Sequence, residues 1–297
     1  MSNLLRSSAL CTALAAMVTA TAAYAGEAGA YHILPMPAHE TRMGHTPWKT
    51  PLGQEEYFGG TVFSNVEVVS VMWGPNVNAT TVADIPDFSA AIVNSTFIDQ
   101  LAEYSTVGVK SVKGKKSSNQ TIGRGTFYGQ VQIAPKNTSL NLTDLQVHKE
   151  IQHQIKIGVL PPEGPNMLYM IYFPSNITIN LDGLISCQDF GAYHFSSHAH
   201  ETSSNIFYSV EPDCNAGFGY LTYAASHEFA EATTDNIPTP GNSPKYPQAW
   251  NTSSGYEIAD LCEGDTGTLT DATTSYEVTQ VYLNNLAGCS SGNYTSP

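Results

Sequence analysis

The sequence predicts an α+β domain in which helices pack on a mixed β-sheet, an α/β-like layered arrangement stabilised by disulfides. Apolar β-rich runs ended by Gly or Pro alternate with segments whose apolar residues recur at helical spacing. Hydrophobic residues make up 41% of the 297 residues, which is enough to form a core. Four cysteines follow the N-terminal segment, and an even number favours two cross-links.

Residues 1–25 have the pattern of a signal peptide. Arg6 supplies the positive charge, Leu10 to Ala23 is apolar, and Ala23-Tyr24-Ala25 fits a small-x-small cleavage site. The apolar run is short for a bilayer span and no stop-transfer segment follows, so we expect no membrane insertion. The pattern predicts a secreted protein, extracellular or periplasmic in a Gram-negative host.

Residues 26–58 are rich in Pro, His, Gly and Thr and lack a clear period, which indicates an extended arm or a pro-like segment packed on the domain. His32, His39 and His45 are too scattered to form a metal motif. Residues 59–297 contain no repeat or linker and are expected to form one domain.

The remaining elements follow from periodicity. Residues 62–73 predict a central strand, and residues 87–104 predict an amphipathic helix with Pro86 at its start. Residues 121–133 predict a strand or hairpin. Further predictions are a helix capped by Asp144 and ended by Gly158, strands at 167–173, 177–181 and 276–283, and an edge strand at 205–210 on which a peptide could lie.

Charge and cysteine spacing exclude several classes of function. The formal net charge is -14, which disfavours nucleic acid and anionic membranes as partners. The cysteines lack the CxxC spacing of a structural zinc site. Of the three possible connectivities we favour the sequence-local pairs, Cys187 with Cys214 and Cys262 with Cys289.

The string Ser226 to Asp235 carries the strongest chemical signal. His227 and Glu231 are four residues apart, so on a helix they share one face and can bind one metal ion. Glu228 is rotated off that line and can take a proton from a metal-bound water as general base. An ordinary surface i,i+4 pair is the alternative, but the surrounding helix is apolar, which favours the metal interpretation.

A catalytic zinc needs a third protein ligand, and Glu257 is the candidate. Asp260 follows one turn later and would orient a ligand through a hydrogen bond. Asp235 is the rival ligand. On a straight helix it lies ~12 Å up the axis from His227, too far for a shared ion, so it would be a ligand only if the helix unwinds at Thr233-Thr234 and has a supporting role otherwise. One imidazole and two carboxylates suit Zn²⁺, with Ca²⁺ as the less fitting alternative.

Residues 187–214 are predicted to be loop-rich and hold three histidines, His194, His198 and His200. A His/Ser-rich surface loop is the first interpretation. His194 lies between aromatic residues and is the best functional candidate, because its imidazole could donate to a developing oxyanion.

His227-Glu228 with Glu257 resembles the gluzincin type of zinc metallopeptidase, with Glu231 where that family has histidine. The strings 225–235, Ala249-Trp250 and 257–262 are similar to a group of secreted bacterial proteins, and the order of elements distantly resembles the plant EXORDIUM, or phosphate-induced, family. The first resemblance implies a zinc peptidase acting on peptide or protein substrates, and the EXORDIUM resemblance implies export and this overall order of elements. The alternative is a non-catalytic secreted protein that binds a cell-wall or other extracellular polymer; the oligomeric state stays open.

Overall fold

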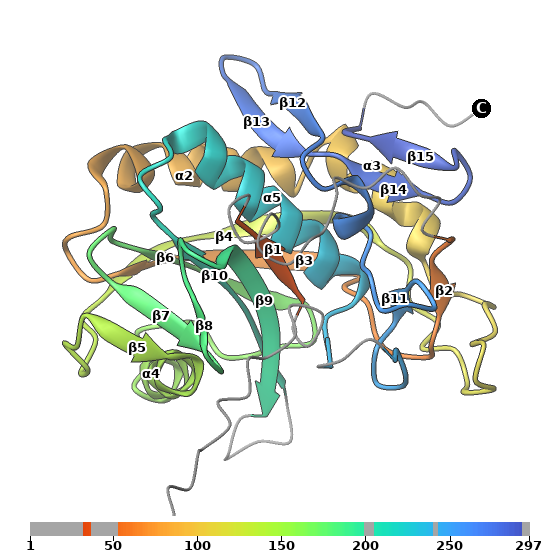
Figure 1. Cartoon of the computed structure of the whole chain (residues 1–297), viewed down its shortest axis with the longest axis horizontal. Coiled ribbons are helices and arrows are strands. Elements are labelled where there is room, and N and C mark those ends of the chain that lie inside the picture. Colours follow the sequence, from red (N-terminus) through yellow and green to blue (C-terminus); the bar gives the residue numbers. More distant parts are fainter. Residues whose placement is uncertain (1–31, 37–52, 199–204, 240–242, 293–297) are drawn as a thin grey trace, which may run out of the picture.

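The computed structural model describes residues 32–36, 53–198, 205–239 and 243–292. Its centre is a six-stranded sheet made of β1 (Ile33–Pro35), β3 (Asn65–Trp73), β4 (Gly123–Ile133), β6 (Met167–Phe173), β9 (Phe190–His198) and β10 (Asn205–Pro212). The strand order is β1-β9-β10-β6-β3-β4 (Figure 1). β4, β3, β6 and β10 are mutually parallel, whereas β9 is antiparallel to both β10 and β1. The predicted α+β fold with a mixed sheet is confirmed.

Helices pack on both faces of this sheet (Figure 1). Side chains of β3 alternate between two cores, because successive residues of a strand point to opposite faces. Val68 lies in the same core as Phe229, whereas Val69 lies in the other core with Ile151. The first core is covered by α2 (Ala79–Ile92), α3 (Thr96–Leu101) and α5 (Phe218–Thr234), and the second by α4 (Asp144–Lys156).

The predicted helix over 87–104 with Pro86 at its start is wrong. α2 begins earlier, after Asn78, whose side chain accepts a hydrogen bond from the first turn, and it ends before α3 begins. Pro86 lies inside α2 and has no N–H for the carbonyl of Val82. The side chain of Gln130 on β4 donates to that carbonyl instead, at 3.2 Å. A contact distant in sequence therefore makes an interior proline tolerable.

Of the two alternatives predicted for residues 121–133, a strand or a hairpin, the structure has the strand: β4 pairs in parallel with β3. One further element prediction needs correction. The strand predicted over 276–283 divides into two strands because its halves pair with different partners. The pairs are β13 (Ser275–Thr279) with β12 (Thr266–Thr270), and β14 (Val281–Leu283) with β15 (Gly288–Ser290).

The cap of α4 is Thr143 rather than the predicted Asp144. The Thr143 hydroxyl accepts from the backbone N–H of Gln146 at 3.4 Å, and the Gln146 side chain accepts from the N–H of Thr143 at 2.9 Å. This reciprocal pair is a capping box. Asp144 lies in the first turn, where its Oδ1 accepts the hydroxyls of Tyr193 and Tyr208.

Replacing Thr143 by Ala is expected to lower the free energy of unfolding by about 1 kcal/mol, because one backbone donor of α4 loses its partner. Thr143→Ser keeps the hydroxyl and should keep the stability of the original protein. Urea denaturation of the three proteins measures the difference. Equal stability of the Ala and Ser variants would show that the capping box contributes nothing.

Both predicted disulfides are confirmed, Cys187–Cys214 and Cys262–Cys289. The first joins the chain before β9 to the chain after β10, and the second joins the short 3₁₀ helix η3 (Asp260–Cys262) to β15.

Besides the β12–β13 and β14–β15 pairs, the described residues form two further small sheets. They contain β5 (Asn141–Thr143), β7 (Thr178–Leu181) and β8 (Leu184–Ile185), and β2 (Glu56–Tyr57) with β11 (Trp250–Asn251). Of the helices that the structure describes, none is long and apolar enough to cross a bilayer.

The region 187–214 differs most from its prediction. It is not loop-rich, because β9 and β10 form an antiparallel pair within it. The strand predicted at 205–210 exists as β10, but it is not an edge strand: β9 and β6 flank it. β1, from the N-terminal segment, adds outside β9 and forms the end of the sheet. Peptide addition to β10 is therefore excluded in this arrangement.

Candidate functional site

Helix α5 carries the His-Glu motif into the interior. It packs on one face of the sheet, and the β12–β13 hairpin lies on its other side (Figure 1). Every residue from Leu221 to Thr234 is buried, and the side chains of His227, Glu228 and Glu231 are 0% exposed. The motif is therefore not an ordinary pair on a solvated helix surface. Burial of three ionisable groups on one helix is costly unless each finds a partner.

His227 and Glu231 face each other, as their spacing predicts. Their Nε2 and Oε1 atoms are 3.0 Å apart, and Asp260 Oδ1 lies 3.6 Å from the same nitrogen. These are ion-pair distances without hydrogen-bond geometry: both ring nitrogens of His227 and Oε2 of Glu231 lack a hydrogen-bond partner among the described residues. The imidazole therefore presents an uncommitted nitrogen to a carboxylate at the separation typical of two ligands of one metal ion.

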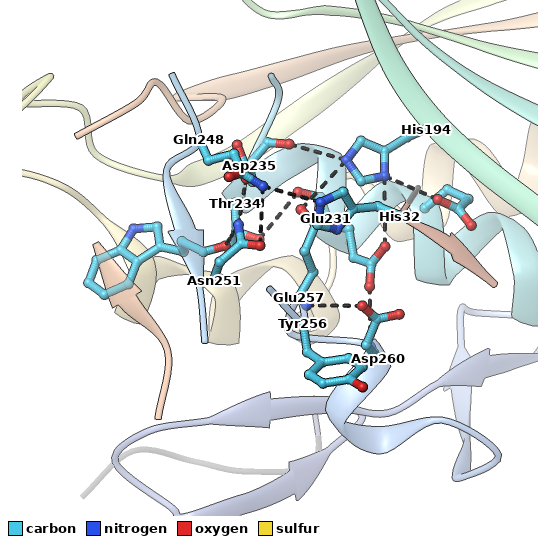
Figure 2. Close-up of polar contacts among 12 residues, drawn as sticks. His32, His194, Glu231, Thr234, Asp235, Gln248, Asn251, Tyr256, Glu257 and Asp260 are labelled. Carbon is cyan, nitrogen blue, oxygen red and sulfur yellow. Dashed lines mark hydrogen bonds and ion pairs between the residues drawn. The ribbon is translucent and has the colours of Figure 1, made fainter. Parts of the chain in front are cut away.

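Glu257 approaches from the loop after β11. Its backbone N–H donates to Asp260 Oδ2 at 3.0 Å, and the N–H of Asp260 donates to Glu231 Oε1 at 3.2 Å (Figure 2). Asp260 thus connects the two carboxylates, which is the position expected of a residue that orients ligands. Its own segment is anchored by the Cys262–Cys289 disulfide.

His194 reaches the site from β9, where it shares the α5-facing side with Ala192. Its Nε2 lies 3.2 Å from the carbonyl oxygen of Asp235 (Figure 2). Its Nδ1 lies 3.1 Å from Glu228 Oε2. A carbonyl oxygen only accepts, so Nε2 carries the proton and Nδ1 of the neutral ring accepts one from Glu228. Burial lowers the pKa of His194 to about 4 and raises the pKa of Glu228 to about 8, which agrees with this proton placement.

Asp235 does not join the ligands by unwinding of the helix. α5 continues through Thr234 and Asp235 is its C-cap. The Asp235 carboxylate accepts from the N–H of Ala249 at 2.9 Å and from Asn251 Nδ2 at 2.6 Å. Burial raises the pKa of Asp235 to about 7. Asp235 therefore fixes the segment around β11 beside the site and holds His194 through its carbonyl oxygen.

Three buried residues at the site were not predicted: His32, Glu55 and Glu211. His32 Nδ1 lies 2.7 Å from Glu257 Oε2, although 225 residues separate the two in sequence. Burial and the neighbouring charge of Glu257 raise the pKa of Glu55 well above its usual range. Burial and the charge of Glu228 likewise raise the pKa of Glu211 well above its usual range. Only Glu211 had a sequence signal, since it falls on the same side of β10 as Phe207, toward α5.

The described residues form two overlapping groups of potential ligands. His194, Glu231 and Glu257 offer ligand atoms within 4.8 Å of one another, and so do His227, Glu228 and Glu231. Glu231 belongs to both, whereas the predicted trio of His227, Glu231 and Glu257 is divided between them. Coordination of one ion by that trio therefore requires Glu257 to move toward His227.

Hydrogen bonding distinguishes the two imidazoles. Both nitrogens of His194 have hydrogen-bond partners, whereas among the described residues neither nitrogen of His227 makes a hydrogen bond, although Nε2 lies at ion-pair distance from Glu231. A metal ligand needs a free lone pair, which His227 would offer once a bound cation displaces its proton. Glu231 Oε2 and Glu257 Oε1 likewise lack hydrogen-bond partners. The residues present therefore fit a divalent cation held by His227 and Glu231, with Glu257 as the third ligand once its carboxylate moves toward His227 and with His194 engaged elsewhere.

The charge of the cluster favours a cation. Buried carboxylates outnumber imidazoles, and burial with mutual repulsion raises the pKa of Glu231 and Glu257. Such groups either keep protons or are neutralised by a bound ion. The six buried carboxylates are Glu55, Glu211, Glu228, Glu231, Asp235 and Glu257, with Asp260 beside them at 14% exposure, and the three imidazoles are His32, His194 and His227.

No known protein family, curated protein or solved structure matches this chain. The function is therefore inferred from the fold and the site alone.

The metal-free protein should lose stability as pH rises from about 6.5 to about 8. Glu228, with a pKa of about 8, and Asp235, with a pKa of about 7, hold protons more tightly when folded than when unfolded, so deprotonation favours unfolding. Burial lowers the pKa of His227, but the negative charges of Glu231 and Asp260 raise it by more. Loss of the His227 proton therefore also destabilises the folded protein as pH rises. Because the pKa of His194 is lowered, its protonation changes the stability of the protein only at pH values below the usual pKa of histidine, outside this range. Each proton accounts for about 1.4 kcal/mol per pH unit at most.

Denaturation of chelator-treated protein at several pH values measures this slope. Glu228→Gln, which does not titrate, should reduce it. Added Zn²⁺ should reverse the slope, because metal binding requires deprotonated ligands. A metal-free protein that is equally stable at pH 6.5 and pH 8 would contradict the assigned proton placement.

Proposed function

We propose that the protein is an exported zinc-dependent peptidase in which His227, Glu231 and Glu257 hold the metal. The observation that carries the proposal is the buried imidazole of His227, which makes no hydrogen bond among the described residues and lies 3.0 Å from Oε1 of Glu231. The other oxygen of that carboxylate, Oε2, also lacks a hydrogen-bond partner there. An imidazole with two carboxylates suits zinc better than calcium, which prefers oxygen ligands alone. Asp260 would hold the ligands in place through its contacts with Glu231 and Glu257.

When bound, zinc supplies a Lewis acid that polarises a carbonyl and makes water easier to deprotonate. Glu228 would be the general base: a bound cation would favour the ionised carboxylate in place of the protonated group of the metal-free protein, and that carboxylate could take a proton from the attacking water and return it to a leaving amine. That proton cycle is what hydrolysis of an amide requires. His194 contacts Glu228 and the Asp235 carbonyl, so it sets the orientation of the base.

Two features support export. Both disulfides are of the kind that persists in oxidising compartments. The sequence of residues 1–25 has the charge and hydrophobic pattern of a signal peptide.

Complete burial of the site favours a second candidate, a secreted binding protein with a structural ion. The side chains of His227, Glu228, Glu231 and Glu257 are all 0% exposed, and closed sites are typical of structural metals. In that case the partner would be an extracellular polymer and Glu228 would have no catalytic role.

Elemental analysis and a hydrolysis assay separate the candidates. The peptidase predicts about one zinc per chain and cleavage of casein that stops with chelator and returns with Zn²⁺. A structural ion predicts the same zinc content with no cleavage. Absence of zinc or another divalent ion from the full-length protein, even after incubation with it, would overturn both.

A further inference from the structure

A short N-terminal segment, His32 to Met36, lies along the outer edge of β9 and reaches the candidate site. Leu34 pairs with Ala192 in antiparallel register, and the N–H of Met36 donates to the Asp189 carbonyl at 3.0 Å. The pairing is only three residues long and ends at a proline, which is tolerated at a sheet edge because it has no N–H to donate. The segment thus lies as a short peptide would lie when added to an exposed strand.

The same segment contacts two residues of the proposed chemistry. His32 Nδ1 lies 2.7 Å from Glu257 Oε2 (Figure 2). The backbone N–H of Leu34 donates a hydrogen bond to the Glu228 carboxyl. A proposed metal ligand and the proposed base therefore both contact this segment, Glu257 through the side chain of His32 and Glu228 through the backbone of Leu34. A strand that served only as the edge of the sheet would not need to contact Glu257 or Glu228.

The side chain of Leu34 occupies an apolar pocket beside the site. It is 2% exposed, whereas its neighbour Ile33 points to the opposite face and joins the core under α4. The pocket combines one residue of β9 with the part of α5 that precedes the His-Glu motif. Its residues are Ala192, Tyr220, Tyr223 and Ala224.

We propose that the edge of β9 from Phe190 to Tyr193 is the strand on which a substrate peptide lies, extended and antiparallel, with an aliphatic side chain in the Leu34 pocket. Residues 32–36 fill this position in cis and must leave before a substrate enters. This inference rests on the proposed function.

A binding measurement that does not depend on catalysis tests the inference. The probe is the fluorescent peptide acetyl-His-Ile-Leu-Pro-Met-amide, which reproduces residues 32–36, added to full-length protein. In the original protein the tethered copy competes at a high effective concentration, so the probe should bind weakly. Leu34→Asp places a charge in the apolar pocket and should release the tethered copy, increasing probe affinity by at least about 10-fold.

Leu34→Met is the matched control, since it preserves volume and apolar character and should bind the probe as the original protein does. A folded Leu34→Asp protein that binds the probe no better than the control would overturn the inference. If Leu34→Asp does not fold, hydrogen exchange of the unaltered protein replaces it. Excess probe should accelerate exchange of residues 32–36 while β9 stays protected; unchanged exchange at the highest probe concentration would overturn the inference.

The two proposals fail in different ways. If probe binding depends on Leu34 but no metal-dependent cleavage occurs, the peptide-binding edge is supported and the peptidase is contradicted. If metal-dependent cleavage occurs and Leu34→Asp changes neither cleavage nor probe affinity, the peptidase is supported and the peptide-binding edge is contradicted.

Discussion

Glu228→Gln is expected to reduce metal-dependent hydrolysis by about 10²- to 10⁴-fold, the usual contribution of a general base. The amide has nearly the shape of the carboxyl group, so it fits the same buried position, but it cannot take a proton from water. The effect should fall on kcat, because Glu228 acts on the reacting water rather than on the bulk of the substrate. Zinc content should stay near that of the original protein.

Glu150→Gln is a suitable control for this measurement. Glu150 is also buried in a helix, but it lies on α4, on the opposite face of the sheet, where it accepts from Gln154 and from the N–H of Lys136. Its variant should keep full activity. Equal activity of Glu228→Gln and Glu150→Gln would exclude Glu228 as the base. Loss of zinc from Glu228→Gln would instead identify Glu228 as a ligand, within the group that it forms with His227 and Glu231.

His227→Ala is expected to lower zinc affinity by more than the 10- to 100-fold that loss of a supporting residue costs. The reason is that His227 offers the only imidazole nitrogens at the described site that have no hydrogen-bond partner. Calorimetric titration of chelator-treated protein with Zn²⁺ measures the affinity. Thermal unfolding with and without zinc gives an independent value, because an ion that binds only the folded state raises its stability.

His194→Ala is the matched comparison. His194 lies in the same cavity, but its nitrogens contact Glu228 and the Asp235 carbonyl, so its loss should weaken zinc binding less than loss of His227 and should alter the pH profile of activity. The opposite order of affinities would place the ion in the second group, with His194, Glu231 and Glu257 as ligands.

The part of the site that the sequence revealed is the part that depends on local geometry. His227 and Glu231 are one helical turn apart, so their meeting needs only that the helix forms. Glu257 and Asp260 are likewise connected within one short segment. The apolar neighbours of the motif correctly predicted its burial, because a helix with no polar face has no side to turn toward water.

The residues that the sequence missed depend on pairing between distant strands. His32 reaches Glu257 only because β1 adds to β9, and nothing near His32 encodes that pairing. The sequence does predict His194 as a functional residue, but it predicts a loop around it, because this Ser- and His-rich segment lacks the apolar pattern of a strand. The segment is a strand because β10 pairs along residues 193–198 and β1 pairs with residues 190–193.

The sequence by itself determined the layered fold class, the helix that carries the His-Glu motif and the two sequence-local disulfides. Each follows from residue spacing within a short window, where chain geometry leaves few alternatives. Only the tertiary structure decided which strand ends the sheet, which carboxylates meet the motif and which segment occupies the β9 edge. Those outcomes depend on hydrogen bonds and burial between residues far apart in the chain, whose free energies no local pattern records.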